Sequence, residues 1–162
     1  MKFKKALCAV MAAVMLFALT ACEESSRAIK LTVMLNGVNV KAPLTVENLG
    51  DDFSLVDGFI SYKDDLVAAP TFDENTRESD DRKKKITLLS GLGKSLSVNG
   101  ITEGSTKSEV RKANGEPAKK SISEQNTETW TYLSDRAPEG IYYLEIQFDD
   151  NDRVWRMNVA FE

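Results

Sequence analysis

The chain has 162 residues, with 25 acidic and 21 basic side chains and a formal net charge of −4. An acidic balance of this kind makes it a poor candidate for binding nucleic acid or anionic lipid surfaces. It contains two cysteines and no histidine. The absence of histidine excludes Ser-His-Asp and Cys-His nucleophile systems, and it also excludes histidine-based metal sites.

The N-terminus has the layout of a signal peptide. Three lysines lie among the first five residues, and residues 6–19 form an apolar run that is too short to span a membrane. The run ends in Leu19-Thr20-Ala21-Cys22, which resembles a lipobox, the cleavage and acylation site of bacterial lipoproteins. We therefore predict a signal peptide over residues 1–21 and a lipid anchor on Cys22. The alternative is an ordinary secretory signal that is cut elsewhere, with Cys22 incidental.

Removal of 21 of the 162 residues would leave 141, with 18 basic and 25 acidic side chains and a net charge of −7. The lost segment includes Cys8, so with Cys22 acylated no free thiol remains for a disulfide or a thiolate metal site. We expect no cofactor and no metal. Residues 22–28 are polar and predict a lipidated tether, which places the protein on the extracytoplasmic face of a cell membrane.

Residues 29–98 predict a small, mostly β unit. Apolar side chains alternate from Ile29 to Leu35, and Asn36-Gly37 is a hairpin signal because both residues accept positive φ. Residues 44–49 predict one or two helical turns, residues 66–69 an edge strand, and residues 86–89 a further strand. The intervening charged segment, residues 73–85, is interpreted either as a partner-docking arm or as a solvated loop.

Residues 99–162 predict a helix followed by a three-stranded antiparallel meander. Thr106 and Glu109 have the spacing of a capping box, Gly115 suits the end of a helix, and Pro117 prevents its continuation. Alternation over residues 129–133, 142–148 and 155–161 predicts three strands, with a tight turn at residues 149–152. The predicted fold class is α+β, with a short helix packed on this three-stranded sheet and the smaller mostly β unit preceding it.

Aromatic side chains are the main candidates for a binding surface. Tyr142 and Trp155 lie on the apolar sides of their predicted strands, so we assign them to the core. Tyr143 lies on the polar side, beside Glu145 and Gln147, and is the candidate partner-binding residue. The competing interpretation is that it makes an ordinary cross-strand pair.

Two nucleotide- and metal-binding motifs are incomplete. Residues 91–95 end like a phosphate-binding loop, but Leu88 stands where the first glycine is required. Asp149-x-Asn151 begins like a calcium loop, but Arg153 occupies the third ligand position. Neither motif predicts a site.

An ordered set of motifs covers about residues 100–162. It comprises Gly100-Ile101-Thr102-Glu103-Gly104-Ser105-Thr106-Lys107-Ser108-Glu109-Val110, Asn114-Gly115-Glu116-Pro117, Trp130-x-Tyr132, and Ile146-x-Phe148-Asp149 followed by Arg153-Val154. This set resembles the SmpA/OmlA/BamE-like lipoprotein domain and, more broadly, the fold of β-lactamase-inhibitor proteins. The whole chain resembles two-part lipoproteins of Gram-positive bacteria. Residues 45–50 are also interpreted as a degenerate copy of residues 106–115.

These observations favour a non-catalytic, membrane-anchored extracytoplasmic lipoprotein that binds a protein or an envelope component. The alternative, implied by the resemblance, is a structural scaffold of an envelope assembly complex of the outer-membrane protein assembly type. A third hypothesis is that the protein is a hydrolase, and the absence of histidine argues against it.

Overall fold

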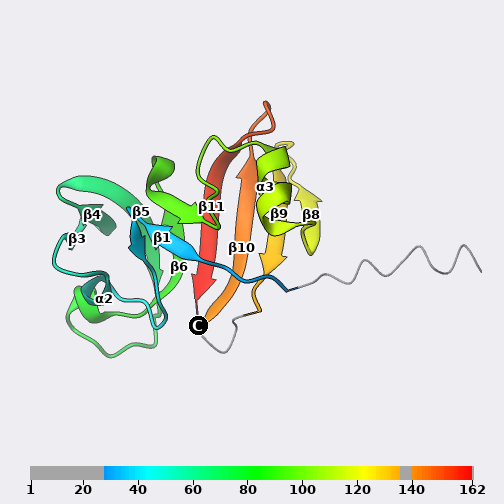
Figure 1. Cartoon of the computed structure of the whole chain (residues 1–162). Coiled ribbons are helices and arrows are strands. Elements are labelled where there is room, and N and C mark those ends of the chain that lie inside the picture. The colour runs from blue at the N-terminus through cyan, green and yellow to red at the C-terminus, as the bar shows by residue number, and fades with distance from the viewer. Residues whose placement is uncertain (1–27, 136–139, 162) are drawn as a thin grey trace, which may run out of the picture.

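A computed structural model describes residues 28–135 and 140–161 of the chain. Its eleven described strands are β1 (Val33–Leu35), β2 (Val38–Asn39), β3 (Phe53–Val56), β4 (Phe59–Tyr62), β5 (Asp65–Phe72), β6 (Ile86–Gly91), β7 (Leu96–Val98), β8 (Lys119–Ile122), β9 (Glu128–Leu133), β10 (Ile141–Phe148) and β11 (Val154–Phe161). The described helices are α2 (Val46–Leu49) and α3 (Lys107–Asn114), with 3-10 turns η1 (Asp81–Lys83) and η2 (Gly93–Ser95). Figure 1 shows their arrangement.

Two antiparallel sheets organise these strands. The large sheet has eight strands in the order β3-β4-β5-β6-β11-β10-β9-β8, and the small sheet has three in the order β2-β1-β7. The predicted α+β fold, with a short helix on a separate three-stranded sheet, is therefore wrong. The expected meander β9-β10-β11 exists, but β8 extends it at one edge and β6 pairs with β11 at the other. Local sequence patterns do not reveal the β6–β11 pairing because Leu89 and Val159, which face each other in it, are far apart in the chain.

The large sheet is built from a repeated unit of one helix followed by four strands. The first unit is α2-β3-β4-β5-β6 and the second is α3-β8-β9-β10-β11, and their last strands meet at the centre of the sheet. Each helix has a threonine N-cap, Thr45 or Thr106, whose side chain accepts a hydrogen bond from the backbone three residues later. Each also ends at a glycine with positive φ, Gly50 or Gly115. The proposed copy of residues 106–115 at residues 45–50 thus has a structural counterpart.

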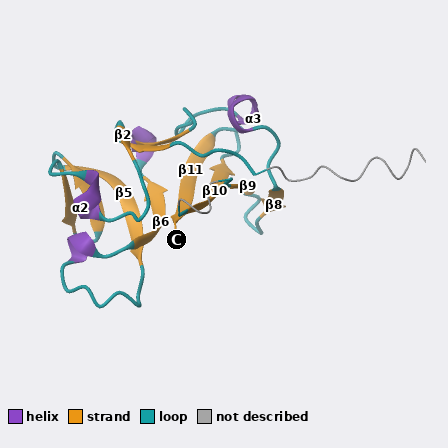
Figure 2. Cartoon of the chain, turned by 60° about the horizontal axis from the view of Figure 1, so that its bottom comes forward, coloured by secondary structure: helices purple, strands orange, loops and turns teal. Residues whose placement is uncertain are grey.

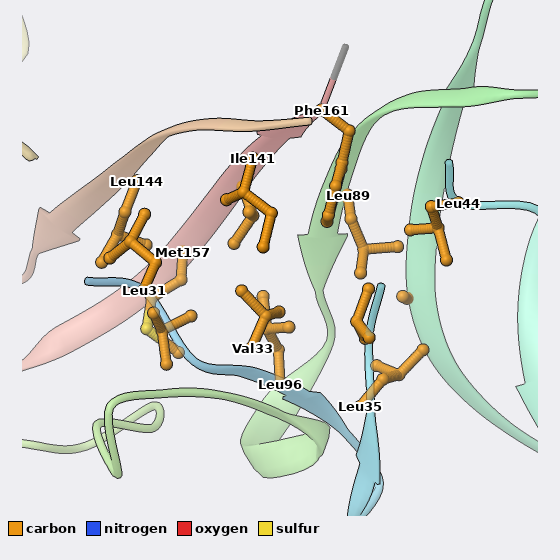
Figure 3. Close-up of a cluster of buried hydrophobic side chains, with 14 of the residues drawn as sticks. Leu31, Val33, Leu35, Leu44, Leu89, Leu96, Ile141, Leu144, Met157 and Phe161 are labelled. Carbon is orange, nitrogen blue, oxygen red and sulfur yellow. The ribbon is translucent and has the colours of Figure 1, made fainter. Parts of the chain in front are cut away.

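The core lies between the small sheet and one face of the large sheet. Figure 2 shows α3 and the small sheet along the same side of the large sheet. In Figure 3, the Leu31 side chain lies beside Leu144 and Met157, and the Val33 side chain points toward Ile141. Buried residues from both halves of the chain form a single hydrophobic cluster. The predicted boundary between residues 98 and 99 falls directly after β7, and as a domain boundary it stays a prediction.

Several local predictions are confirmed. The hairpin at Asn36-Gly37 joins β1 to β2, and both turn residues have positive φ. Helix α3 has the expected capping box, in which the Thr106 side chain and the Glu109 side chain each bond the other's backbone N–H. The strand predicted at residues 66–69 exists as part of β5, but the prediction that it lies at an edge is wrong, because β5 pairs with β4 on one side and with β6 on the other. Its pairing with β4 extends only as far as Ala68. Pro70 therefore has no β4 partner opposite it, so the N–H it lacks is not required there.

The assignment of Trp155 to the core is wrong, because a β-bulge shifts the phase of β11. Phe148 pairs with Val154, whereas Gln147 pairs with Arg156, so Trp155 is an extra residue between them. Val154 takes the buried position, and Trp155 is 45% exposed.

A second bulge affects Tyr142, which was also assigned to the core. Ile141 pairs with Phe161 and Tyr143 with Ala160, which leaves Tyr142 between the two pairs. Ile141 is buried and Tyr142 is half-buried.

Candidate functional site

The large sheet has one face toward the core and one face away from it, which we call the open face. Leu88, Thr131, Leu133, Tyr143, Glu145 and Asn158 lie on the open face, alternating with buried core residues such as Leu89, Tyr132 and Leu144. Tyr143, the residue predicted from the polar side of its strand, is half-buried on this face. Its role in binding stays a prediction.

Cross-strand register aligns apolar side chains beside Tyr143. Tyr143 pairs with Leu133 on β9 and with Ala160 on β11, and Ala160 pairs with Leu88 on β6. These four residues form a row across four adjacent strands, which we call the apolar row. Leu133 is 43% exposed, and Tyr143 and Leu88 are half-buried. Alternation identified Tyr143, but only the strand register reveals its neighbours in the row.

A polar row lies two residues away along each strand, on the same face. Thr131, Glu145, Asn158 and Ser90 pair in that order across β9, β10, β11 and β6. The Ser90 hydroxyl is 2.7 Å from the Asn158 side-chain oxygen and donates to it. The open face therefore offers an apolar strip bordered by hydrogen-bonding groups, a composition typical of protein–protein contact surfaces.

The other half of the open face carries a second apolar group. Val56, Phe59 and Leu66 are 45%, 38% and 49% exposed. Val56 pairs with Phe59, and Leu66 pairs with Ser61, which lies on the same side of β4 as Phe59. Together with Leu133 they make four of the six strongly exposed large hydrophobic side chains in the described part of the chain. Such clustering is more informative than scattered exposed apolar residues.

On the core side of the sheet, ion pairs of Lys107 hold α3 against the strands. Its ammonium lies 2.6 Å from Glu128 Oε2, also contacts Asp152, and lies 5.2 Å from the centre of the Phe148 ring. Burial lowers the pKa of Lys107, but its hydrogen bonds to Asp152 and Glu128 outweigh burial and the net pKa is raised. The hydrogen bond from Lys107 lowers the pKa of Glu128, although burial opposes this.

Trp130 links this cluster to the edge of the sheet. Its indole Nε1 donates to Glu128 Oε1 at 2.5 Å, and the Arg111 guanidinium and Lys120 ammonium lie 5.0 and 5.2 Å from its ring centre. Glu116 pairs with Arg111 at 3.0 Å and with Lys120 at 2.9 Å. These contacts fix α3 against β8 and β9. Lys107 and Glu128 therefore have structural partners that account for their altered pKa values.

The described residues contain no group of three or more histidine, cysteine, aspartate or glutamate side chains placed to hold a metal ion. In the same part of the chain, no helix is long and apolar enough to cross a membrane. Cys22, the predicted lipidation site, lies outside the described residues. Among the described surfaces, the open face has the composition that best supports protein binding.

A mostly β domain with one covered and one open sheet face belongs to no single functional class. Residues 94–157 match the family model of the outer membrane protein assembly factor BamE domain. The match includes β7, α3, β8, β9 and β10, and part of β11. The predicted resemblance of the C-terminal part to a BamE/SmpA-like domain is therefore confirmed. No curated protein and no solved structure matches the chain.

Proposed function

We propose that this protein is a non-catalytic, lipid-anchored envelope protein that binds a protein partner through the open face of its large sheet. The observation that carries the proposal is the apolar row Leu133–Tyr143–Ala160–Leu88 with its polar border. The BamE domain match supports a role related to envelope protein assembly. In that role the partner is a component of an assembly complex, and the protein acts as a structural scaffold of that complex.

The position of Ile29, close to the predicted tether in the sequence, supports a membrane-proximal location for the apolar row. The Ile29 backbone N–H donates to the Leu133 carbonyl at 2.9 Å, and the Asp135 N–H donates to the Ile29 carbonyl at 2.9 Å. The tether therefore joins the domain beside Leu133. Cys22 lies six residues before Ala28 in the sequence, a length of chain that reaches roughly 20 Å when extended. A lipid on Cys22 would thus keep this end of the sheet close to the bilayer.

The anchor is tested by the substitution Cys22→Ser, followed by membrane fractionation of cells. We expect the variant to leave the membrane fraction, because a diacylglyceryl anchor supplies two chains and stable anchoring requires two. Metabolic labelling with a fatty acid should mark the native protein and fail to mark the variant. Continued membrane association of the Ser variant, with no label on the native chain, would mean that the lipobox interpretation is wrong.

The binding face is tested by photo-crosslinking from single positions in intact cells. A photoreactive amino acid at Leu133 or Tyr143 should capture a discrete envelope protein. The matched control is the same amino acid at Ile122, which is 68% exposed and lies on β8 at the edge of the sheet. Equal capture from Ile122 would show that exposure, rather than the open face, explains the crosslinks.

A pair of substitutions compares the contribution of the apolar row to partner binding with that of Ile122. Leu133→Lys places a charge in the apolar row, and Ile122→Lys places the same charge at another exposed apolar side chain. We expect Leu133→Lys to reduce recovery of the crosslinked partner about tenfold or more. We expect Ile122→Lys to leave recovery unchanged. Both variants should keep the native thermal midpoint, since both side chains are exposed.

A further inference from the structure

Strand β2 forms one outer edge of the small sheet, whose strand order is β2-β1-β7. The Val40 N–H donates to the Val33 carbonyl at 2.9 Å, so the backbone of Val40 is directed toward β1. Successive residues of an antiparallel strand direct their backbone groups to opposite edges. The N–H and carbonyl groups of Asn39 and Lys41 therefore point away from β1, and both residues are exposed.

These outward-pointing backbone groups have no partner within the described part of the chain. No hydrogen bond there involves the backbone N–H or carbonyl of Asn39 or Lys41. The opposite edge of the small sheet differs, because the Val98 N–H donates to the Ile101 carbonyl and the Ile101 N–H donates to the Val98 carbonyl, both at 2.9 Å. Strand β7 is thus closed by the chain that follows it, whereas β2 keeps an open edge to which another strand can be added.

A cavity of about 310 Å³ lies along this open edge. Asn39 and Lys41 line it and Val40 between them does not, which places the cavity on the outer side of β2. Helix α2 supplies Asn48 and Leu49 to the wall. The volume lies at the lower end of the range for pockets that hold ligands. A strand added to β2 would therefore have the strand edge on one side and α2 on the other.

The cavity offers different chemistry to the two faces of an added strand. Its apolar wall comes from Leu44 and Leu49, which belong to the hydrophobic core. Val40 is buried in the same core, so Lys41 points to the other face of its strand. Lys41 is exposed and takes part in no ion pair among the described residues, and no acidic residue lines the cavity. Apolar and acidic side chains in alternation match these two faces.

We propose that the outer edge of β2 and residues 42–49, together called the edge groove, bind an extended peptide of alternating acidic and apolar residues. The peptide would become a fourth strand of the small sheet and exchange hydrogen bonds with the backbone of Asn39 and Lys41. Its apolar side chains would face the wall formed by Leu44 and Leu49, and an acidic side chain would pair with Lys41. The edge groove is separate from the open face and does not depend on the function proposed for it.

The test uses the full-length, isotope-labelled protein and an acetylated, amidated hexapeptide of alternating glutamate and valine. At a peptide concentration about ten times the Kd, amide hydrogen exchange of Asn39 and Lys41 should slow about tenfold, since only the free protein then exchanges. Exchange at Val40, whose N–H is already bonded to Val33, is the internal control and should change less.

A second peptide isolates the contribution of the backbone. The same hexapeptide with every backbone amide N-methylated lacks the strand donors and should bind at least about tenfold more weakly. Equal binding of the two peptides would refute strand addition.

Two variants test the groups on the protein. Asn39→Pro removes an outward N–H that β1 does not use, a change that edge strands tolerate, and it should weaken binding of the hexapeptide about tenfold or more. Lys41→Glu reverses the charge beside the groove and should also weaken binding about tenfold. The matched control is Lys112→Glu, the same charge change at an exposed position of α3, which should bind as the native protein does. Native-like spectra establish that each variant is folded, and Lys41→Glu alone decides if Asn39→Pro is not.

Three results would overturn the proposal. The first is unchanged hydrogen exchange at Asn39 and Lys41 at millimolar hexapeptide. The second is a response confined to Tyr143 and its neighbours, which would place the peptide on the open face. The third is protection of the Asn39 amide that grows with protein concentration without peptide, which would make a second copy of the chain the occupant.

Discussion

Gly115 is a position at which backbone geometry restricts the residue type. It ends α3 with φ 75° and ψ −156°, and its N–H donates to the Arg111 carbonyl at 2.8 Å. The sequence predicts this glycine at the end of the helix. The ψ value, however, places the residue in an extended region that only glycine adopts readily, rather than in the left-handed helical region that asparagine also tolerates.

The cost of a side chain at this position comes from the backbone alone. A Cβ added to Gly115 would have no other atom within 4 Å, so substitution creates no steric clash. We expect Gly115→Ala to lower the free energy of unfolding by about 1–3 kcal/mol, the usual cost of a residue held in a disfavoured region. For a chain of 162 residues this corresponds to a fall of roughly 2–12 °C in the thermal midpoint. Gly115→Val should cost at least as much, and Gly115→Asn should give no rescue.

Circular dichroism melts of these variants provide the measurement. The control is Ala113→Val, an exposed position in α3 with ordinary helical geometry, where valine should cost less than about 1 kcal/mol. If Gly115→Ala melts with the native protein, the proposed backbone strain is refuted. If Gly115→Asn is native-like while Gly115→Ala is not, the residue occupies the left-handed helical region instead.

Two further predictions concern the groups around α3. Lys107→Met should lower the free energy of unfolding at neutral pH by roughly 1–3 kcal/mol. This value lies between the usual contribution of an exposed ion pair and that of a hydrogen bond to a charged group. Because the folded-state pKa of Glu128 is lowered, its contribution is present above the unfolded pKa near 4.5 and is lost as pH falls through the folded pKa. Urea titrations should therefore show a shallower loss of stability below pH about 4.5 in Lys107→Met than in the native protein, and parallel profiles would count against the ion pair. The Tyr132 hydroxyl donates to the Gly115 carbonyl at 3.2 Å, so Tyr132→Phe should cost about 0.5–1.5 kcal/mol in the same titrations. Since burial raises the pKa of Tyr132, ultraviolet titration should show this phenol ionising only with alkaline unfolding, and ionisation in the folded protein would contradict its burial.

The candidate site was partly predictable. Alternation of polar and apolar residues was enough to place Tyr143 away from the core, because side chains of a strand point to opposite faces in turn. The same rule failed for Trp155, since a bulge inserts this residue between Val154 and Arg156 and so removes it from the alternation that holds from Met157 onward. Leu133 and Leu88 could not be identified as neighbours of Tyr143, because their alignment depends on which strands pair and in which register.

The sequence by itself determined the local structure whose causes are local. The capping box of α3, the glycine that ends it, the Asn36-Gly37 hairpin and the alternation of β9 and β10 all follow from interactions between residues a few positions apart. The motifs of residues 100–162 also carried the resemblance that the family match confirms.

Only the tertiary structure decided how these pieces combine. The pairing of β6 with β11 joins two four-stranded repeats into one sheet, and its register sets the apolar row. This pairing depends on contacts between residues distant in the chain, where many alternative pairings satisfy the same local pattern and only the shared core selects one.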